Sequence, residues 1–142
     1  MIQVLVVDDH EQWRRFASTT LLNHFHLQIS GQASDGLEAV QRAQDLQPDL
    51  ILLDIGLPTQ NGIEAAKQIR IVSPLSKILF VSENRSPDIA EAALNTGAGG
   101  YVLKSDAAKD LLLGVQAVLE GKGFISRTVA RHFLQSTVLS AT

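Results

Sequence analysis

Four short apolar runs in this sequence are each followed directly by charged or hydroxyl side chains. These side chains are Asp8, Asp9, Asp54, Ser82 and Lys104. Taken singly, an Asp after a strand is most often a helix cap, and a Ser or Lys at the start of a loop is usually solvated. If the runs are strands of one parallel sheet, however, all five side chains gather at one edge, and that grouping needs a common cause.

Three carboxylates gathered at one edge repel one another. Two of them about 4 Å apart repel by roughly 1 to 4 kcal/mol, depending on the effective dielectric, and each raises the other's pKa unless a cation is present. A cluster of oxygen ligands suits Mg²⁺, which commonly serves phosphate chemistry. Asp54 is then a candidate carboxylate nucleophile for phosphoryl transfer. Lys104 can bind the oxygens of the transferred group by charge, and Ser82 can bind them by a hydrogen bond.

The elements that must position these residues alternate between short apolar runs and longer helical patterns. Strands are expected at 4–7, 28–33, 50–53, 78–81 and 101–103, and helices at about 11–23, 37–46, 61–74, 86–97, 107–119 and 126–135. Five such repeats require right-handed crossovers and a parallel sheet covered on both faces. We therefore expect an α/β protein with a flavodoxin-like, doubly wound (βα)5 three-layer fold, strand order 2-1-3-4-5, and a functional crevice beyond the carboxyl ends of the strands.

Length and composition exclude several classes of protein. The 142 residues carry 12 Lys and Arg against 15 Asp and Glu, a net charge of −3, which predicts one domain that does not bind nucleic acid by itself. The absence of Cys excludes a disulfide framework, a Cys-based zinc site and a thiol nucleophile. No apolar run approaches the roughly 20 residues of a membrane span, and no secretory signal pattern is present. We expect a cytoplasmic protein without a membrane partner.

The order and spacing of the motifs resemble the receiver domains of two-component response regulators, over about residues 2–125. The motifs are Asp8-Asp9, the stretch 50–58, Asn61-Gly62, Ser82 and Tyr101-Val-Leu-Lys104. The resemblance implies that Asp54 accepts a phosphoryl group from a sensor histidine kinase, and that the domain is a regulatory phosphoacceptor rather than an enzyme. It implies that Asp9, Asp54 and the backbone carbonyl of Gly56 bind Mg²⁺ directly, while Asp8 binds it mostly through water. Ser82 and Lys104 would contact the phosphoryl group, and Tyr101 would change rotamer on activation.

Two further stretches, 97–105 and 119–126, resemble the NarL/LuxR-type subgroup. Members of that subgroup usually carry a DNA-binding output domain after a linker, which implies a role in transcription regulation. We expect a receiver domain at 1–125, followed at 126–142 by a helix and the start of a linker. A truncated receiver is favoured over a stand-alone one, with homodimerisation as a possible output of phosphorylation.

Three other functions are alternatives to this signalling switch. A phosphatase of the haloacid dehalogenase type needs a second aspartate two residues after the nucleophile, where this chain has Gly56. A receiver-like interaction module independent of phosphate is kept open by Glu83, whose charge would lie beside the phosphoryl group. A flavin-binding module would need a hydroxyl- and glycine-rich loop in place of Asp8-Asp9.

The remaining aromatic and His residues carry weaker expectations. Trp13 and Phe16 are expected on the buried face of the helix at 11–23, as core or dimer contacts. The four His residues show no metal-like spacing and are expected at the surface or as caps. They are His10, His24, His26 and His132.

Overall fold

The computed structural model describes residues 1–22, 24 and 26–131 of the chain. The helices and strands alternate along the sequence as expected, with small shifts at their ends. In chain order they are β1 (Ile2–Val7), α1 (Glu11–Leu21), β2 (Leu27–Ala33), α2 (Gly36–Leu46), β3 (Leu50–Leu53), α3 (Gly62–Val72), β4 (Lys77–Ser82), α4 (Pro87–Leu94), β5 (Gly100–Leu103), the 3-10 turn η1 (Lys104–Asp106), α5 (Ala107–Leu119) and β6 (Phe124–Ile125).

The strands form one parallel sheet in the order β2-β1-β3-β4-β5-β6. The order of the first five strands confirms the expected doubly wound topology. The sixth strand corrects the expected count of five. It contains only Phe124 and Ile125, which pair with Gly100 and Tyr101 of β5, so it is too short to give a strand signal in the sequence.

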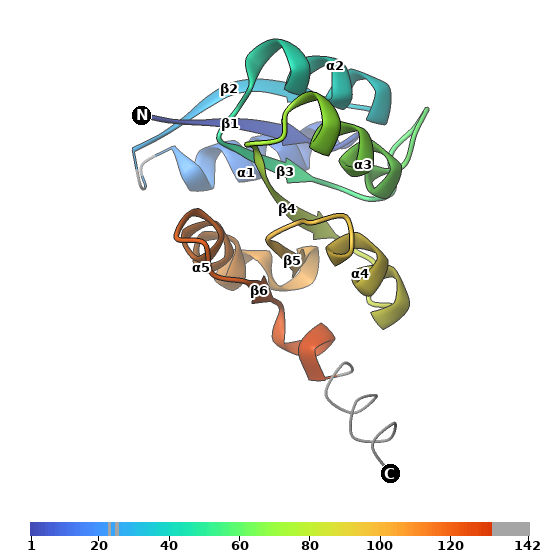
Figure 1. Cartoon of the computed structure of the whole chain (residues 1–142). Helices are drawn as coiled ribbons and strands as arrows, with labels where there is room; N and C mark the ends of the chain where they lie inside the picture. The colour runs from blue at the N-terminus through green and yellow to red at the C-terminus, as the bar shows by residue number, and fades with distance from the viewer. Residues whose placement is uncertain (23, 25, 132–142) are drawn as a thin grey trace.

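Helices cover both faces of the sheet and give the expected three layers (Figure 1). One apolar cluster packs α2, α3 and α4 against one face of the sheet. A second cluster packs α1 and α5 against the other face. Because both faces are covered, the central strands are buried along their length; β3, for example, has the continuous apolar sequence Leu-Ile-Leu-Leu.

The register of the strands brings their carboxyl ends together. Val7 of β1 pairs with Leu53 of β3, and Leu53 in turn pairs with Phe80 of β4. Asp8 and Asp54 are therefore the first residues beyond two neighbouring strands. In the neighbouring pair of strands, Ser82 of β4 lies opposite Leu103 of β5. Lys104, the residue after Leu103, therefore leaves the sheet beside Ser82.

Helix starts follow the capping chemistry that the sequence indicates. The Asn61 side chain accepts a hydrogen bond from the Glu64 N–H at the start of α3, as expected. Ser86 caps α4 in the same way, with Pro87 at the first helical position. Gly97 has φ +95°, the left-handed conformation that suits the chain just beyond this helix.

Two expectations about buried residues need correction or completion. Phe16 of α1 is 37% exposed, so it is not a core residue, and Trp13 is only partly buried. The core on this helix comes from Ala17 and Leu21. Of the helix expected at 126–135, residues 127–131 are helical and Val129 is buried; residues 132–135 lie outside the described part of the chain.

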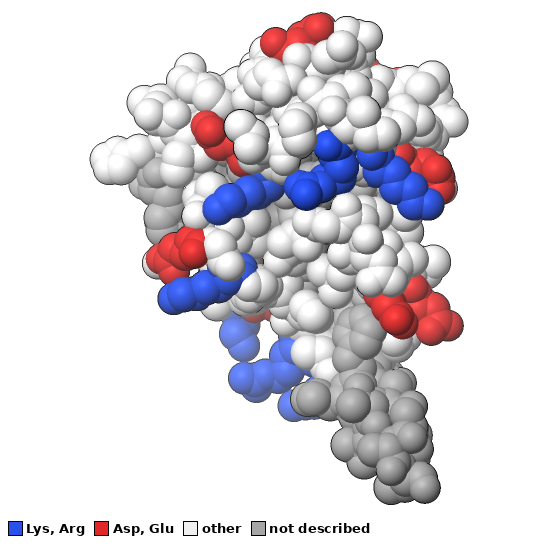
Figure 2. All heavy atoms as spheres, in the orientation of Figure 1, with Lys and Arg blue, Asp and Glu red and all other residues white. Residues whose placement is uncertain are grey.

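The surface carries charges of both signs. In the face shown in Figure 2, Lys and Arg side chains form a row across the middle, with Asp and Glu side chains around it. This face thus has no broad, uninterrupted basic surface. Among the helices that the structure describes, none has the length and apolar character needed to cross a membrane.

Candidate functional site

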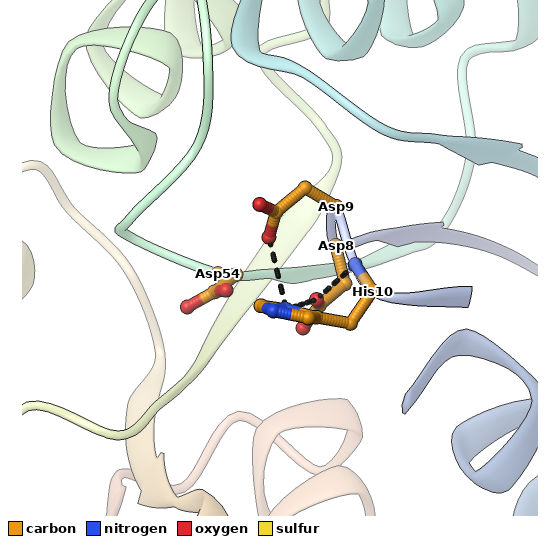
Figure 3. Close-up of side chains that lie close together, drawn as sticks. All are labelled: Asp8, Asp9, His10 and Asp54. Carbon is orange, nitrogen blue, oxygen red and sulfur yellow. Dashed lines mark hydrogen bonds and ion pairs between the residues drawn. The ribbon is translucent and has the colours of Figure 1, made fainter. Parts of the chain in front are cut away.

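Three carboxylates meet where β1 and β3 end. Asp8 is completely buried and Asp54 is 6% exposed, whereas the Asp9 side chain is 29% exposed. One oxygen from each of these residues and one ring nitrogen of His10 all lie within 4.8 Å of one another, and Figure 3 shows the four side chains converging. The structure therefore brings together the acidic residues that the sequence analysis placed at this edge.

Lys104 extends into this cluster from the end of β5. Its Nζ lies 2.7 Å from Oδ2 of Asp8 and 3.2 Å from Oδ2 of Asp54, and its side chain is 10% exposed. Burial alone would lower the pKa of Lys104, but its close contact with Asp8 and the charges of Asp54 and Asp8 outweigh burial and raise the pKa above its ordinary value. Lys104 is thus a firmly protonated ammonium at neutral pH.

Asp54 is held in an electrostatically unfavourable position. Its Oδ1 accepts a hydrogen bond of 2.7 Å from the backbone N–H of Ile55. Burial and the nearby Asp8 charge raise the pKa of Asp54 above its ordinary value, against the opposing effects of Lys104 and the Ile55 N–H. One ammonium does not fully offset two buried carboxylates, so a further positive charge would be favourable here.

His10 adds an imidazole to a site that the sequence predicts to consist of oxygen ligands. Its Nδ1 lies 3.3 Å from Oδ1 of Asp8 and 3.1 Å from Oδ1 of Asp9. The side chain is 67% exposed and the residue precedes α1, in agreement with a surface position. In the sequence, the one indication that His10 belongs to this cluster is its position directly after Asp9. His132 lies outside the described residues.

Ser82 and Tyr101 are linked through the loop after β4. The Ser82 Oγ accepts a hydrogen bond of 3.1 Å from the Asn84 N–H. The hydroxyl of Tyr101 donates to the carbonyl oxygen of the same Asn84 at 2.7 Å. Tyr101 is completely buried, and this burial raises the pKa of its hydroxyl. Its ring is therefore directed into the protein, where it supports the loop from β5.

A cavity of about 330 Å³ opens at this edge of the sheet. The residues that line it are His10, Asp54, Ile55, Gly56, Ser82, Glu83, Asn84 and Lys104. Glu83 is exposed at its border. A larger cavity of about 520 Å³ lies along α5, but none of the three converging carboxylates lines it. The chemistry of the lining residues, rather than the size of the cavity, identifies the site.

Gly62 fixes the backbone beneath Asp54. A Cβ atom at Gly62 would stand 1.9 Å from the carbonyl oxygen of Asp54. The Gly62 N–H also donates to the carbonyl oxygen of Ile55 at 2.7 Å. Helix α3 therefore begins directly against the chain that carries Asp54, and any side chain at this glycine would displace it.

The donor set fits a hard divalent cation such as Mg²⁺. Carboxylate oxygens predominate, and the cavity beside them leaves room for water ligands. The buried Oδ2 of Asp8 accepts no well-directed hydrogen bond, although it is ion-paired with Lys104. A buried carboxylate oxygen in this state can take a cation as a further partner.

The sheet order and this acidic edge are those of a receiver domain. The family profile described as "Response regulator receiver domain" matches residues 4–116, and the chain belongs to this family of two-component signalling proteins. The similarity to known proteins extends beyond the matched residues and points to the NarL/LuxR-type subgroup.

The relatives include the response regulator GacA of Pseudomonas viridiflava, 32% identical over 132 residues, which are 93% of this chain and 62% of that protein. VraR of Staphylococcus aureus (strain Mu3 / ATCC 700698) is 35% identical over 121 residues, covering 85% of this chain and 58% of VraR. The chain thus spans about three fifths of the length of these relatives. A solved LuxR-family response regulator from Aurantimonas sp. SI85-9A1 superposes with a TM-score of 0.92 at 28% identity, covering 97% of this chain and 99% of that one.

Proposed function

We propose that this domain is a phosphorylation-dependent switch in which Asp54 is the phosphoacceptor. The observation that carries the proposal is the convergence of Asp54 with a second buried carboxylate and one ammonium at the open edge of the sheet. In the reaction, a carboxylate oxygen of Asp54 forms a bond to phosphorus while the bond from phosphorus to the donor nitrogen of a kinase phosphohistidine breaks. The product is an acyl phosphate on Asp54.

Asp8, Asp9 and Asp54 would hold Mg²⁺, together with the backbone carbonyl of Gly56, which lies in the stretch lining the cavity. When bound, this ion supplies positive charge that offsets the negative charge of the carboxylates and of the incoming phosphoryl oxygens. The raised pKa of Asp54 supports the assignment, because burial and Asp8 already make its negative charge costly without such an ion.

Lys104 and Ser82 would bind the phosphoryl oxygens. Lys104 already contacts Asp54, and its ammonium stays protonated at neutral pH. Ser82 ends the neighbouring strand, and its hydroxyl lies at the same cavity. A charged donor and a neutral donor placed in advance around the transferred group stabilise the charge that develops on its oxygens.

Ser82 and Tyr101 would convert phosphorylation into a change of shape. Both side chains are hydrogen-bonded to Asn84 in the loop after β4, so a Ser82 hydroxyl drawn toward phosphoryl oxygens would release one of the two bonds that hold this loop. Moving such a two-state equilibrium from 1:99 to 99:1 requires about 5.5 kcal/mol. The phosphoryl group carries about −1.5 to −2 charges beside Lys104, in place of the single negative charge of the Asp54 carboxylate, and its contacts with Lys104 and Ser82 would supply that energy.

The partners would be a sensor histidine kinase and, in a longer protein, a DNA-binding output domain that regulates transcription. The similarity to GacA, VraR and a LuxR-family regulator supports this assignment. The proposed receiver unit is 1–125, which ends with β6, and 126–142 would lead toward the output domain. Homodimerisation of the phosphorylated form remains a prediction.

The alternative functions have less support. A haloacid dehalogenase-type phosphatase has no candidate general acid at Gly56, although that glycine lies at the cavity. A phosphate-independent interaction module would not need the buried ion pairs of Lys104 with Asp8 and Asp54, because buried ion pairs contribute little to stability. Glu83 lines the same cavity but is exposed, where water and salt screen its charge.

Incubation with acetyl phosphate and Mg²⁺ tests the proposal. We expect the intact protein to gain one phosphoryl group, detected by mass spectrometry and lost on treatment with hydroxylamine, which cleaves acyl phosphates. Asp54→Ala should gain none. Asp49→Ala is the matched control, because Asp49 is a carboxylate at the opposite edge of the sheet, where it accepts a hydrogen bond from Gln3 N–H.

Equal labelling of Asp54→Ala and the wild type would refute the assignment of Asp54. Continuous release of inorganic phosphate from phosphate esters would instead favour the phosphatase. Transfer from candidate kinases, measured with the same two variants, then tests the proposed partner.

A further inference from the structure

The indole of Trp13 lies against the ammonium of Lys104. The Lys104 Nζ is 5.2 Å from the centroid of the Trp13 ring. Trp13 belongs to the first turn of α1, where its backbone N–H donates to the carbonyl oxygen of His10 at 3.1 Å. The residue is thus tied to the same short segment that carries the acidic residues, and it meets a side chain that comes from the end of β5.

Among the described residues, the ammonium of Lys104 contacts two carboxylates and one neutral group. Asp8 and Asp54 attract the ammonium at 2.7 and 3.2 Å, while the Trp13 ring provides an aromatic face. Conversion of Asp54 to an acyl phosphate changes the charges around Lys104, but it leaves the Trp13 ring unchanged. Trp offers the most strongly attracting aromatic face to a cation.

We propose that Trp13 is a positioning residue for phosphoryl transfer, which holds the ammonium of Lys104 at the phosphoacceptor edge. This inference rests on the proposed function of Asp54. Trp13 touches no reacting atom in the proposed reaction and acts through Lys104 alone. The cation–π contact restricts the long Lys104 side chain before the phosphodonor arrives, which reduces the ordering that the transition state requires.

Three variants distinguish the effect of the aromatic ring of Trp13 from the effect of its size. Trp13→Leu removes the ring but keeps an apolar side chain against the α1–α5 core cluster, which Trp13 partly contacts. Trp13→Phe keeps a smaller aromatic face. Phe16→Leu is the matched control, because it removes the neighbouring ring, 4.9 Å from Trp13 and 37% exposed, without altering the indole.

We expect Trp13→Leu to slow labelling of Asp54 by saturating acetyl phosphate and Mg²⁺ about three- to tenfold. Trp13→Phe should recover most of the rate, and Phe16→Leu should label at the wild-type rate. The Mg²⁺ dissociation constant, measured by calorimetry, should be the same in all of them. A general disturbance of the site would weaken Mg²⁺ binding together with the rate, whereas a displaced Lys104 affects the rate.

Three outcomes would overturn the inference while leaving the proposed function intact: wild-type labelling rates in Trp13→Leu, equal loss in Trp13→Phe and Trp13→Leu, or parallel loss of Mg²⁺ affinity and rate. Wild-type protein that is not labelled at Asp54 would instead overturn the proposed function. The two failures are therefore distinguished by the wild-type reaction.

Fluorescence tests the contact without any phosphorylation. Trp13 is the one Trp in the chain, so its emission reports its own surroundings. We expect Lys104→Met, or Lys104→Gln if the first variant does not fold, to change the emission of the metal-free protein. Lys109→Met, an exposed position on α5, should not change it. Identical spectra for the wild type and the folded Lys104 variants would show that the contact is absent in solution and overturn the inference.

Discussion

The two edges of the sheet bury polar groups in opposite ways. At the carboxyl edge, two buried carboxylates share one ammonium, and burial raises the pKa of Asp54. At the amino edge, the buried polar side chains of the described residues are neutral hydroxyls. Ser73 and Ser76 are 1% and 2% exposed there, yet no charge accompanies them into the interior.

The amino edge satisfies its polar groups within the protein. The Ser73 and Ser76 hydroxyls lie 2.6 Å apart, and Ser76 Oγ also donates to the carbonyl oxygen of Pro48. Oε1 of Gln47 lies 3.3 Å from Ser73 Oγ, and Nε2 of Gln47 donates to the carbonyl oxygen of Val72 at 2.9 Å. This network joins the ends of α2 and α3 with the loop before β4, and it requires no ligand.

This difference indicates that the amino edge stabilises the fold, whereas the carboxyl edge destabilises it. Neutral groups with complete hydrogen bonding stabilise the amino edge. The carboxyl edge keeps like charges close together, an arrangement that is unfavourable until a cation or a phosphoryl group changes the balance. Substitutions at the amino edge should therefore affect stability, and those at the carboxyl edge should affect chemistry.

The sharpest test of this comparison replaces one lysine at each edge. Lys104→Met removes the ammonium beside Asp54, and we expect labelling by acetyl phosphate to slow by about 100-fold or more, the usual effect of losing one charge-stabilising donor. Lys77→Met removes a lysine at the amino edge, whose Nζ donates to the carbonyl oxygen of Leu119 at 3.0 Å. Its labelling rate should match the wild type.

Both rates are measured from the mass of the intact protein over time. If Lys77→Met slowed labelling as much as Lys104→Met, the two edges would not be functionally distinct. If neither variant slowed it, Lys104 would have no part in the reaction.

The second test moves to the amino edge. Ser76→Ala removes a hydroxyl that joins Ser73 and the Pro48 carbonyl, leaving buried partners unsatisfied. We expect the free energy of unfolding in urea to fall by about 1–3 kcal/mol, with labelling of Asp54 unchanged. As a control, Ser105→Ala alters an exposed serine and should leave the unfolding free energy near the wild-type value. A slower rate in Ser76→Ala would contradict the separation of the edges.

Most of the fold could be predicted from sequence because its signals are local. The runs Val4–Val7 and Leu50–Leu53 are continuous and apolar, and each is followed directly by Asp residues. Parallel pairing then requires that these carboxyl ends meet at one edge, which the register of Val7 with Leu53 bears out. Asp8 and Asp54 could therefore be placed side by side without coordinates.

The rest of the site depends on packing that no local pattern encodes. The contact between Trp13 and Lys104 joins residues far apart in the chain and depends on how α1 packs on its face of the sheet. The participation of His10 depends on the direction of one exposed side chain. The sixth strand has two residues, fewer than any periodicity can reveal.

The third test adds Mg²⁺. If the carboxyl edge lacks positive charge, Mg²⁺ at ten times its dissociation constant should increase the free energy of unfolding by about 1.4 kcal/mol. Asp9→Asn removes the most exposed of the three carboxylates, so it should fold normally but lose this gain. Asp49→Asn, at the amino edge, should keep it. An equal gain in all three proteins would mean that the ion does not bind at the acidic cluster.

The last and smallest effect is the cost of the Asp54 charge itself. Burial and Asp8 raise the pKa of Asp54 above the ordinary value of 3.8. Between 3.8 and that raised pKa the folded protein binds more protons than the unfolded chain, so this group makes stability fall as the pH rises through that window. Above the window the full cost is present. Asp54→Asn, which removes the charge but can still accept from the Ile55 N–H, should avoid it.

Without Mg²⁺ at neutral pH, we expect Asp54→Asn to unfold at a higher urea concentration than the wild type, by on the order of 1 kcal/mol. The advantage should shrink as the pH falls, and it should vanish well below 3.8, where the wild-type carboxyl is protonated in both states. Asp49→Asn serves as the control at the amino edge, where no such pH-dependent gain is expected. A wild type as stable as Asp54→Asn at neutral pH would mean that Lys104 fully offsets both buried carboxylates. The two edges would then differ in geometry but not in energy.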